Sequence, residues 1–200
     1  YTMTSLLTTG GIRGSQKRIQ RFEPRSFNMG LSRKAFEATG GFGKIHPGED
    51  PDLVIRLWKQ GFDTAFIPTA FVFHKRRISW EKFRTQVSKF GQTRAILNHW
   101  HPESRKLTFW LPTCFTLGLC GALLLLVWGR IEPLLVYVCY FILIAWDSAR
   151  ENRSVKIGLL SVWALLVQFF SYGWGFLRAT LKITFVKKPI ETLFPHLFFK

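Results

Sequence analysis

With 200 residues and a formal net charge of +16, the chain is long enough for one medium domain and is strongly basic. No zinc-finger spacing and no RNA-binding aromatic signature accompanies the charge, so nucleic acid is not an expected partner. The three cysteines lie in apolar runs without a Cys-x-x-Cys pair, which argues against a disulfide framework or a metal site. The charge is unevenly distributed, because 19 of the 28 Lys and Arg residues precede residue 107 while the long uncharged runs follow it.

The opening residues 1–14 carry no signal-peptide pattern. They are rich in threonine, contain no charge before Arg13 and are interrupted by Gly10-Gly11. This is the composition of an internal segment, so we expect the chain to be truncated at its N-terminal side.

The most informative stretch begins with the glycine-rich loop Gly40–Gly43. Asp50-Pro51 then starts a short predicted helix, which Gly61 ends. β-branched and aromatic residues over 62–73 predict an extended, strand-like segment. That segment leads into a basic cluster made of His74, Lys75, Arg76 and Arg77.

Asp50 has two interpretations. An aspartate directly before a proline is a good helix N-cap, and the neighbouring Glu49 and Asp52 suit the positive end of the helix dipole. Alternatively, a helix start that gathers acidic groups beside a glycine-rich loop can present a carboxylate at a cleft. The combination with the downstream basic cluster favours the second interpretation.

His74 is open to two interpretations as well. A single histidine after a strand is commonly a structural or surface residue. With Arg76 and Arg77 beside it, however, the same strand end offers an imidazole and two cations where phosphate groups can bind.

Residues 79–99 predict one amphipathic helix. Its apolar side chains recur at steps of three and four, and Lys82, Arg84 and Lys89 lie off that stripe. The stripe suits packing against the rest of the domain. It equally suits a helix at the bilayer surface, where basic and aromatic residues are typical.

Three uncharged runs follow, and they predict membrane segments. Residues 108–128 are long enough to cross the hydrocarbon core as a helix. Residues 133–146 form a shorter partner for a hairpin, and residues 157–177 make the third run.

The basic loops predict the orientation of these segments. The positive-inside rule places the basic first half and the loop 147–156 on the cytoplasmic side, with Arg130 outside. A full third crossing would place outside the basic residues Arg178, Lys182, Lys187 and Lys188. Either the third run is re-entrant or interfacial, or the residues after it depart from the rule.

As a whole, residues 25–101 resemble the inverting GT-A glycosyltransferases of family 2. The order and spacing of several short motifs carry the resemblance, and no single motif would suffice. The motifs are Ser26-Phe27-Asn28-Met29, Arg33-Lys34-Ala35-Phe36, Gly40-Gly41-Phe42, Glu49-Asp50 with Asp52-Leu53, Arg56-Leu57 with Gly61, Phe66-Ile67-Pro68, Val72-Phe73-His74 and Phe90-Gly91.

The resemblance implies a role for each acidic residue of the turn. The aspartate of the Glu-Asp pair is the general base in that family. Asp50 would therefore take the proton from an acceptor hydroxyl as its oxygen attacks the anomeric carbon with inversion. Glu49 would shape the acceptor site, and Asp52 would be a structural or secondary acidic residue.

The resemblance also implies a donor side. Asn28, Arg76 and Arg77 are the implied donor contacts, and His74 is a candidate metal ligand near the diphosphate. The implied cofactor is a divalent cation, Mn²⁺ or Mg²⁺, held mainly by an Asp-x-Asp motif upstream. No such motif precedes Gly40 and the nucleotide-binding strands are missing, so we expect the chain alone to be inactive.

The expected fold class is α/β, the C-terminal half of a GT-A doubly wound domain, followed by an α-helical transmembrane region. We expect four parts along the chain. These are a partial catalytic domain at 1–78, an amphipathic interfacial helix and linker at 79–106, two to three transmembrane helices at 107–186 and a basic, aromatic tail at 187–200.

The predicted function is transfer of a sugar from a nucleotide-sugar donor to a hydroxyl acceptor, either lipid-linked or a growing glycan. The expected location is the cytoplasmic face of the inner membrane, in polysaccharide biosynthesis of the cell envelope, with anionic lipids as further partners. The rival prediction is a non-catalytic basic membrane anchor that holds a partner. It explains the charge and the apolar runs, but not the order of the motifs.

Overall fold

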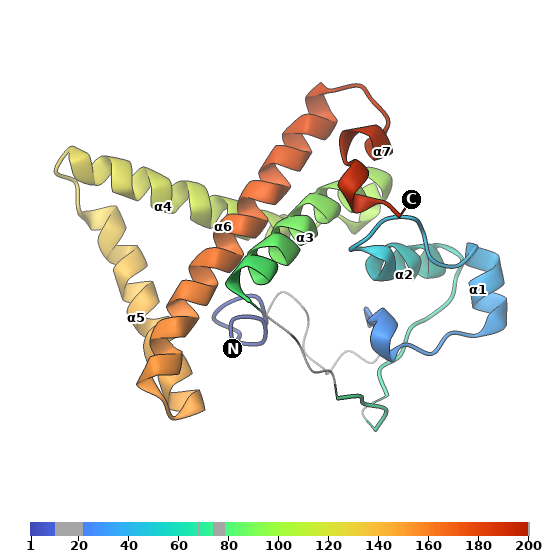
Figure 1. Ribbon diagram of the computed structural model, residues 1–200, viewed down its shortest axis with the longest axis horizontal. Helices are drawn as coiled ribbons and strands as arrows, with labels where there is room; N and C mark the ends of the chain where they lie inside the picture. Colours follow the sequence, from blue (N-terminus) through green and yellow to red (C-terminus); the bar gives the residue numbers. More distant parts are fainter. Residues whose placement is uncertain (11–21, 68, 74–78, 200) are drawn as a thin grey trace.

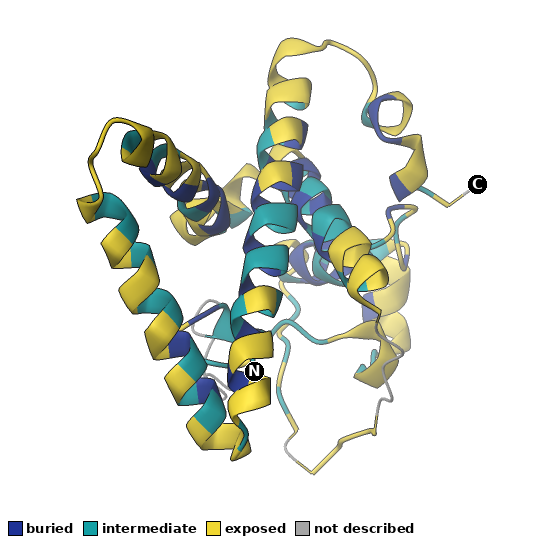
Figure 2. Ribbon diagram, turned by 60° about the vertical axis from the view of Figure 1, so that its left-hand side comes forward, coloured by how far each residue is buried: buried dark blue, intermediate teal, exposed yellow. Residues whose placement is uncertain are grey.

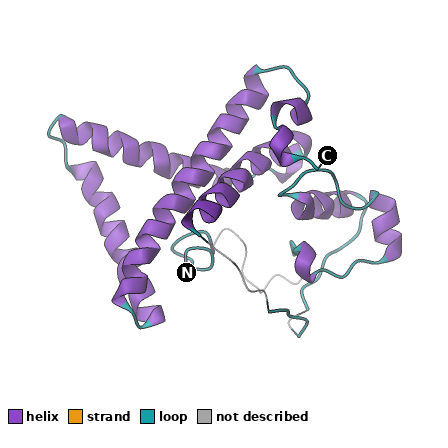
Figure 3. Cartoon of the chain, in the orientation of Figure 1, coloured by secondary structure: helices purple, strands orange, loops and turns teal. Residues whose placement is uncertain are grey.

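The computed structural model describes residues 1–10, 22–67, 69–73 and 79–199, and these fold mainly as helices (Figures 1 and 3). The helices are α1 (Arg33–Thr39), α2 (Glu49–Lys59), α3 (Trp80–Trp100), α4 (Leu111–Val127), α5 (Glu132–Asn152), α6 (Val155–Phe185) and α7 (Ile190–Leu193). The long helices α3 to α6 lie on one side of the molecule, and α1 and α2 lie on the other (Figure 1).

The α/β fold predicted for the first part of the chain is wrong. The described residues contain no strand, and their strand-like pairing is limited to one isolated bridge between Ile45 and Phe198. Residues 62–67 and 69–73 are non-helical, but no strand partner is present among the described residues. β-branched and aromatic residues favour a strand only where a neighbouring backbone can pair with it, so their propensity is not realised here.

α1 and α2 form a small helical unit that carries the acidic turn. Ser32 caps α1 by accepting a hydrogen bond from the Ala35 backbone N–H (3.2 Å), and Gly40 ends the helix with a left-handed φ of 72°. α2 is amphipathic, and its buried residues Leu53 and Leu57 pack against Ala35. The burial of this face fixes the direction in which α2 begins.

α3 confirms the helix predicted at residues 79–99, and it packs along α6 (Figure 1). Two glycines let the helices approach closely. A Cβ on Gly91 would lie 2.3 Å from the Tyr172 carbonyl oxygen, and a Cβ on Gly175 would lie 2.6 Å from that of Ser88. α3 therefore packs closely on another helix of the chain, and its position at a bilayer surface stays a prediction.

Three segments are long and apolar enough to cross a membrane: Leu107–Val127, which is α4 with the 3-10 turn before it, α5 and α6. They coincide with the three predicted apolar runs. α6 has 31 residues, which extend about 46 Å at 1.5 Å per residue. Only Ile144 and Ser148 of α5 are buried, and exposed residues line the outer faces of α4 and α5 (Figure 2). Helices of this length and composition are typical of a membrane protein.

Polar groups inside the apolar region are paired between helices. The Thr113 hydroxyl on α4 donates to the Gly173 carbonyl on α6 (3.1 Å), and the Ser148 and Ser161 hydroxyls of α5 and α6 are 2.7 Å apart. Cys114, Cys120 and Cys139 of these helices are free. Such pairing is required where water is absent.

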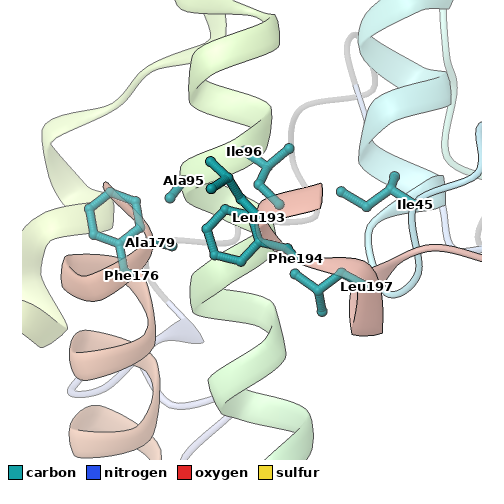
Figure 4. Packing of buried hydrophobic residues seen from close by; sticks show 8 residues of the cluster. All are labelled: Ile45, Ala95, Ile96, Phe176, Ala179, Leu193, Phe194 and Leu197. Atoms are coloured by element: carbon teal, nitrogen blue, oxygen red, sulfur yellow. The ribbon is translucent and has the colours of Figure 1, made fainter. Parts of the chain in front are cut away.

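The largest buried cluster lies where α3, α6 and the residues after α6 meet (Figure 4). Ile96 of α3, Phe176 of α6 and Leu197 after α7 are almost fully buried in it. Ile45, from the loop that precedes α2, joins the same cluster. The core therefore connects the long helices to the acidic turn.

Candidate functional site

The acidic turn is placed at the start of α2 by the preceding loop. Gly48 adopts a φ of 122°, which only glycine accepts readily, and it leads directly into Glu49. The loop is held on its α3 side, because the Thr93 hydroxyl donates to the Pro47 carbonyl oxygen at 2.7 Å. A glycine before the helix lets the chain turn sharply enough for the three acidic residues to share its first turn.

The Glu49 carboxylate is occupied by local contacts. Its Oε2 atom accepts a hydrogen bond from the Gly48 backbone N–H at 2.9 Å and lies 3.1 Å from Nδ1 of His46. Glu49 thereby fixes the shape of the turn and the direction of the His46 ring.

Asp52 is buried and paired on both oxygens. Oδ2 accepts from Nε and Nη2 of Arg56 at 3.0 and 2.9 Å, and Oδ1 lies 2.9 Å from Nε2 of His101. Lys59 contacts Nδ1 of the same imidazole at 2.9 Å. An ammonium can only donate, so Nδ1 accepts and the Nε2–H donates to Asp52. Asp52 therefore fastens α2 to the end of α3.

Two further contacts extend this network. Arg56 also donates to the Gly41 carbonyl at 2.8 Å, which ties the glycine-rich loop to α2. Lys59 lies 2.9 Å from Glu103, and this hydrogen bond holds the pKa of the exposed Glu103 carboxyl below its ordinary value. The acidic turn is thus attached to the glycine-rich loop through Arg56 and to the end of α3 through His101.

Asp50 differs from both of its acidic neighbours. Its Oδ1 atom is buried, yet it has no hydrogen-bond partner in the described part of the chain. A buried carboxylate oxygen without a partner is costly, and it is rare in proteins outside sites of function or strain. This separates Asp50 from Glu49 and Asp52, whose carboxylates both have hydrogen-bond partners.

A cavity of about 400 Å³ lies beside this turn, between the preceding loop and α3. His46, which contacts Glu49, forms part of its wall. The other lining residues are Pro47, Glu81, Lys82, Thr85, Gln86 and Lys89. Two lysines against the one carboxylate of Glu81 give the lining an excess of positive charge, which suits a ligand that carries an anionic group.

The remaining predicted site residues are not gathered at this turn. Asn28 is exposed, and its side-chain amide donates to the Ala70 carbonyl at 3.2 Å. His74, Arg76 and Arg77 lie outside the described residues. Within the described ranges, no group of three His, Cys, Asp or Glu residues is arranged to hold a metal ion.

Sequence reasoning missed the residues that support the turn. The spacing of Asp52 and Arg56, one helical turn apart, is a usable local signal for their ion pair. His101 gave no signal, because it is 49 positions from Asp52 along the chain.

The described residues thus form a helical protein with three helices long and apolar enough to cross a membrane, and with an acidic turn at the start of α2. Residues 27–148 match the family model described as glycosyl transferase family group 2. The chain belongs to that family and is a glycosyltransferase, which confirms the predicted family and class of enzyme. No curated protein and no solved structure matches the chain.

Proposed function

We propose that this chain is part of a membrane-bound enzyme that transfers a sugar from a nucleotide-sugar donor to a hydroxyl acceptor with inversion. Asp50 is the general base of the proposed reaction. The observation that carries this assignment is the contrast within the turn, where both neighbouring carboxylates are engaged and Asp50 Oδ1 is buried without a partner in the described residues.

The proposed step uses the carboxylate of Asp50 to remove the acceptor's hydroxyl proton. The acceptor oxygen forms a bond to the anomeric carbon while the bond between that carbon and the diphosphate oxygen breaks. The nucleoside diphosphate leaves with the electron pair, and the proton stays on Asp50 until solvent removes it. General-base assistance of this kind contributes about 10²- to 10⁴-fold to the rate.

Glu49 and Asp52 take supporting roles in this proposal. Glu49 keeps the acceptor side of the turn in shape through Gly48 and His46. Asp52 keeps the start of α2 in place through Arg56 and His101. Both carboxylates thus have structural contacts, through Oε2 of Glu49 and through both oxygens of Asp52.

The acceptor is proposed to enter through the cavity beside His46. Lys82 and Lys89 line this cavity, and their charges suit the phosphate of a lipid-linked acceptor. A growing glycan is the other acceptor class. The nearby membrane helices support an acceptor held at the bilayer, and the basic loops favour the cytoplasmic face of the inner membrane.

Family 2 glycosyltransferases commonly use a divalent cation. The described residues do not fit such a role by themselves, because they contain no group of three candidate ligands. No step is therefore assigned to Mn²⁺ or Mg²⁺. The donor contacts Asn28, Arg76 and Arg77 and the metal ligand His74 remain predictions from the sequence.

The first test is Asp50→Asn in the full-length protein in native membranes. The assay measures release of nucleoside diphosphate from a panel of UDP-, GDP- and dTDP-sugars. We expect turnover to fall at least 100-fold, because the amide cannot accept the proton, while the affinity for UDP, GDP or dTDP is unchanged. Asp63→Asn, at an exposed position in the loop after α2, is the matched control and should keep full turnover. Near-normal turnover of the Asp50 variant would contradict the assignment.

A further inference from the structure

The residues that follow α7 lie against the loop that leads to Glu49 and Asp50. The His46 backbone N–H donates to the Leu197 carbonyl at 2.7 Å, and the Phe199 N–H donates to the Lys44 carbonyl at 2.9 Å. Between these two bonds, Ile45 pairs with Phe198 in an antiparallel bridge. Residues Leu197–Phe199 and the loop Lys44–Gly48 before the acidic turn, called the catalytic loop below, are therefore joined through their backbones.

Side chains reinforce this contact. The rings of His46 and Phe199 stack with their centroids 5.0 Å apart. Ile45 and Leu197 are 1% and 0% exposed, and they lie in the cluster that Figure 4 shows between α3 and the end of α6. Ile45 is the loop's contribution to that cluster, so the loop is anchored in the core chiefly through one side chain.

The segment Ile190–Phe199 is itself held by α6. The Lys182 ammonium of α6 donates to the Leu193 carbonyl at 2.7 Å and lies 5.1 Å from the centre of the Phe194 ring. Ala179 and Phe176 of α6 pack into the same buried cluster. A shift of α6 would therefore move Ile190–Phe199 and, through its backbone hydrogen bonds, the loop Lys44–His46.

A third attachment comes from α3. Nε2 of His196 lies 2.9 Å from Oε1 of Gln92. Loss of hydration, followed by the positive charges of Lys89 and Lys182, lowers the pKa of His196. The imidazole is therefore kept neutral at neutral pH, which leaves an Nε2–H free to donate to the Gln92 amide oxygen.

We propose that Ile190–Phe199 is a positioning strap, which fixes the Asp50 carboxylate relative to the membrane helix α6. Leu197 and Phe199 are its positioning residues; they act through Lys44–His46 and do not touch the substrate. The proposal rests on the function proposed above for Asp50. A general base must lie within hydrogen-bond reach of the proton it removes, and a displacement of about 1 Å can cost 100-fold in rate. An acceptor held at the bilayer makes the position of Asp50 relative to α6 decisive.

The test compares Leu197→Asp with Thr192→Asp in the full-length protein in native membranes. Both variants add the same charge to the strap, but Leu197 is buried whereas Thr192 is exposed. Amide hydrogen exchange of residues 42–50 reports the loop directly, since the His46 N–H is bonded to the strap. We expect exchange there to become at least tenfold faster in Leu197→Asp and to be unchanged in Thr192→Asp.

Turnover provides the second readout. We expect Leu197→Asp to lower kcat at least tenfold with the donor KM within twofold of wild type. The conservative variant Leu197→Met should keep both kcat and KM near their wild-type values. Unchanged exchange, or full turnover despite faster exchange, would overturn the strap. A loss of donor binding together with kcat would assign Leu197 to general packing and would overturn it as well.

The outcomes separate the strap from the proposed function. If Asp50→Asn is inactive and Leu197→Asp is fully active, the strap fails and the general base stands. Suppose instead that Asp50→Asn keeps its turnover, while Leu197→Asp loses turnover and exchanges the amides of residues 42–50 faster. The role of Asp50 as general base then fails. In that case the strap positions a different group of the loop.

Discussion

Asp52 and Asp50 lie on the same helical turn, two residues apart, but the contacts of their carboxylates differ. Asp52 is 5% exposed and accepts hydrogen bonds from Arg56 and His101. Asp50 has a buried oxygen without a partner among the described residues. Asp52 therefore links α2 to the end of α3, whereas Asp50 is the residue to which the proposed function assigns proton transfer.

This difference predicts opposite results from the same substitution. Asp52→Asn keeps the shape of the side chain but removes the charge that Arg56 and His101 face. We expect it to lower the free energy of unfolding by about 2–3 kcal/mol, because buried hydrogen bonds to a charged group are lost or weakened. Asp50→Asn should leave the unfolding midpoint little changed. Thermal unfolding of the detergent-purified protein measures both, and equal midpoints for the two variants would contradict the distinction.

At this scale the sequence predicted the residues but not their contacts. The Glu49-Asp50 pair and Asp52 were found from their order and spacing, and Asp52 was expected to be structural or secondary. The partner that makes it structural, His101, is 49 positions away. No local pattern contains such a pairing, because it depends on how α2 and α3 are brought together.

Among the helices, the packing of α3 on α6 depends on two close backbone approaches. Gly91 and Gly175 each face a carbonyl oxygen of the other helix at a distance that leaves no room for a Cβ atom. The apolar and basic pattern of residues 79–99 predicted a helix and left its partner open. The choice of α6 as the partner of α3 depends on the shape of the two helices, since a glycine on each lets their backbones come this close.

Gly91→Ala tests this packing. An alanine Cβ would lie 2.3 Å from the Tyr172 carbonyl oxygen, so α3 and α6 must separate, and we expect destabilisation of about 1–3 kcal/mol from the overpacked contact. Gly121→Ala on α4 is the matched control, because no atom lies within 4 Å of its Cβ position. That change should be neutral or slightly stabilising, since alanine favours helix. Unfolding midpoints of the two variants check the difference; equal effects would contradict the close approach.

For the molecule as a whole, the backbone contact of Leu197–Phe199 with Lys44–His46 limits how the chain can be placed in a membrane. Two segments joined by backbone hydrogen bonds must lie on the same side of a hydrocarbon core about 30 Å thick. The end of α6, with Lys187 and Lys188 after it, is therefore expected on the catalytic side. Because α6 is one continuous helix, this favours the interfacial alternative for the third apolar run and removes its conflict with the positive-inside rule.

Labelling with a membrane-impermeant maleimide tests this topology. Lys34→Cys on α1, Lys188→Cys after α6 and Arg130→Cys between α4 and α5 are exposed positions. They are introduced singly into a background without Cys114, Cys120 and Cys139. We expect Lys34→Cys and Lys188→Cys to be labelled from the same face and Arg130→Cys from the other. Labelling of Lys188→Cys together with Arg130→Cys would contradict the arrangement.

The sequence alone determined the features that depend on neighbouring residues. The acidic turn, the helical stripe of residues 79–99 and the three apolar runs depend on residues one to four positions apart, and they appear in α2 to α6. The cap predicted at Asp50 does not form, because α2 begins at Glu49 with Gly48 as its N-cap. The family followed from the order of such short motifs along the chain.

Only the tertiary structure decided what depends on distant backbone partners. Residues 62–67 and 69–73 have strand propensity, yet the described residues provide no strand beside them, and the predicted α/β fold is absent there. The isolated bridge of Ile45 with Phe198 forms instead across most of the chain's length. Propensity is a property of one segment, whereas a strand pair, a buried ion pair or a strap needs two segments placed side by side by the packing of the helices between them.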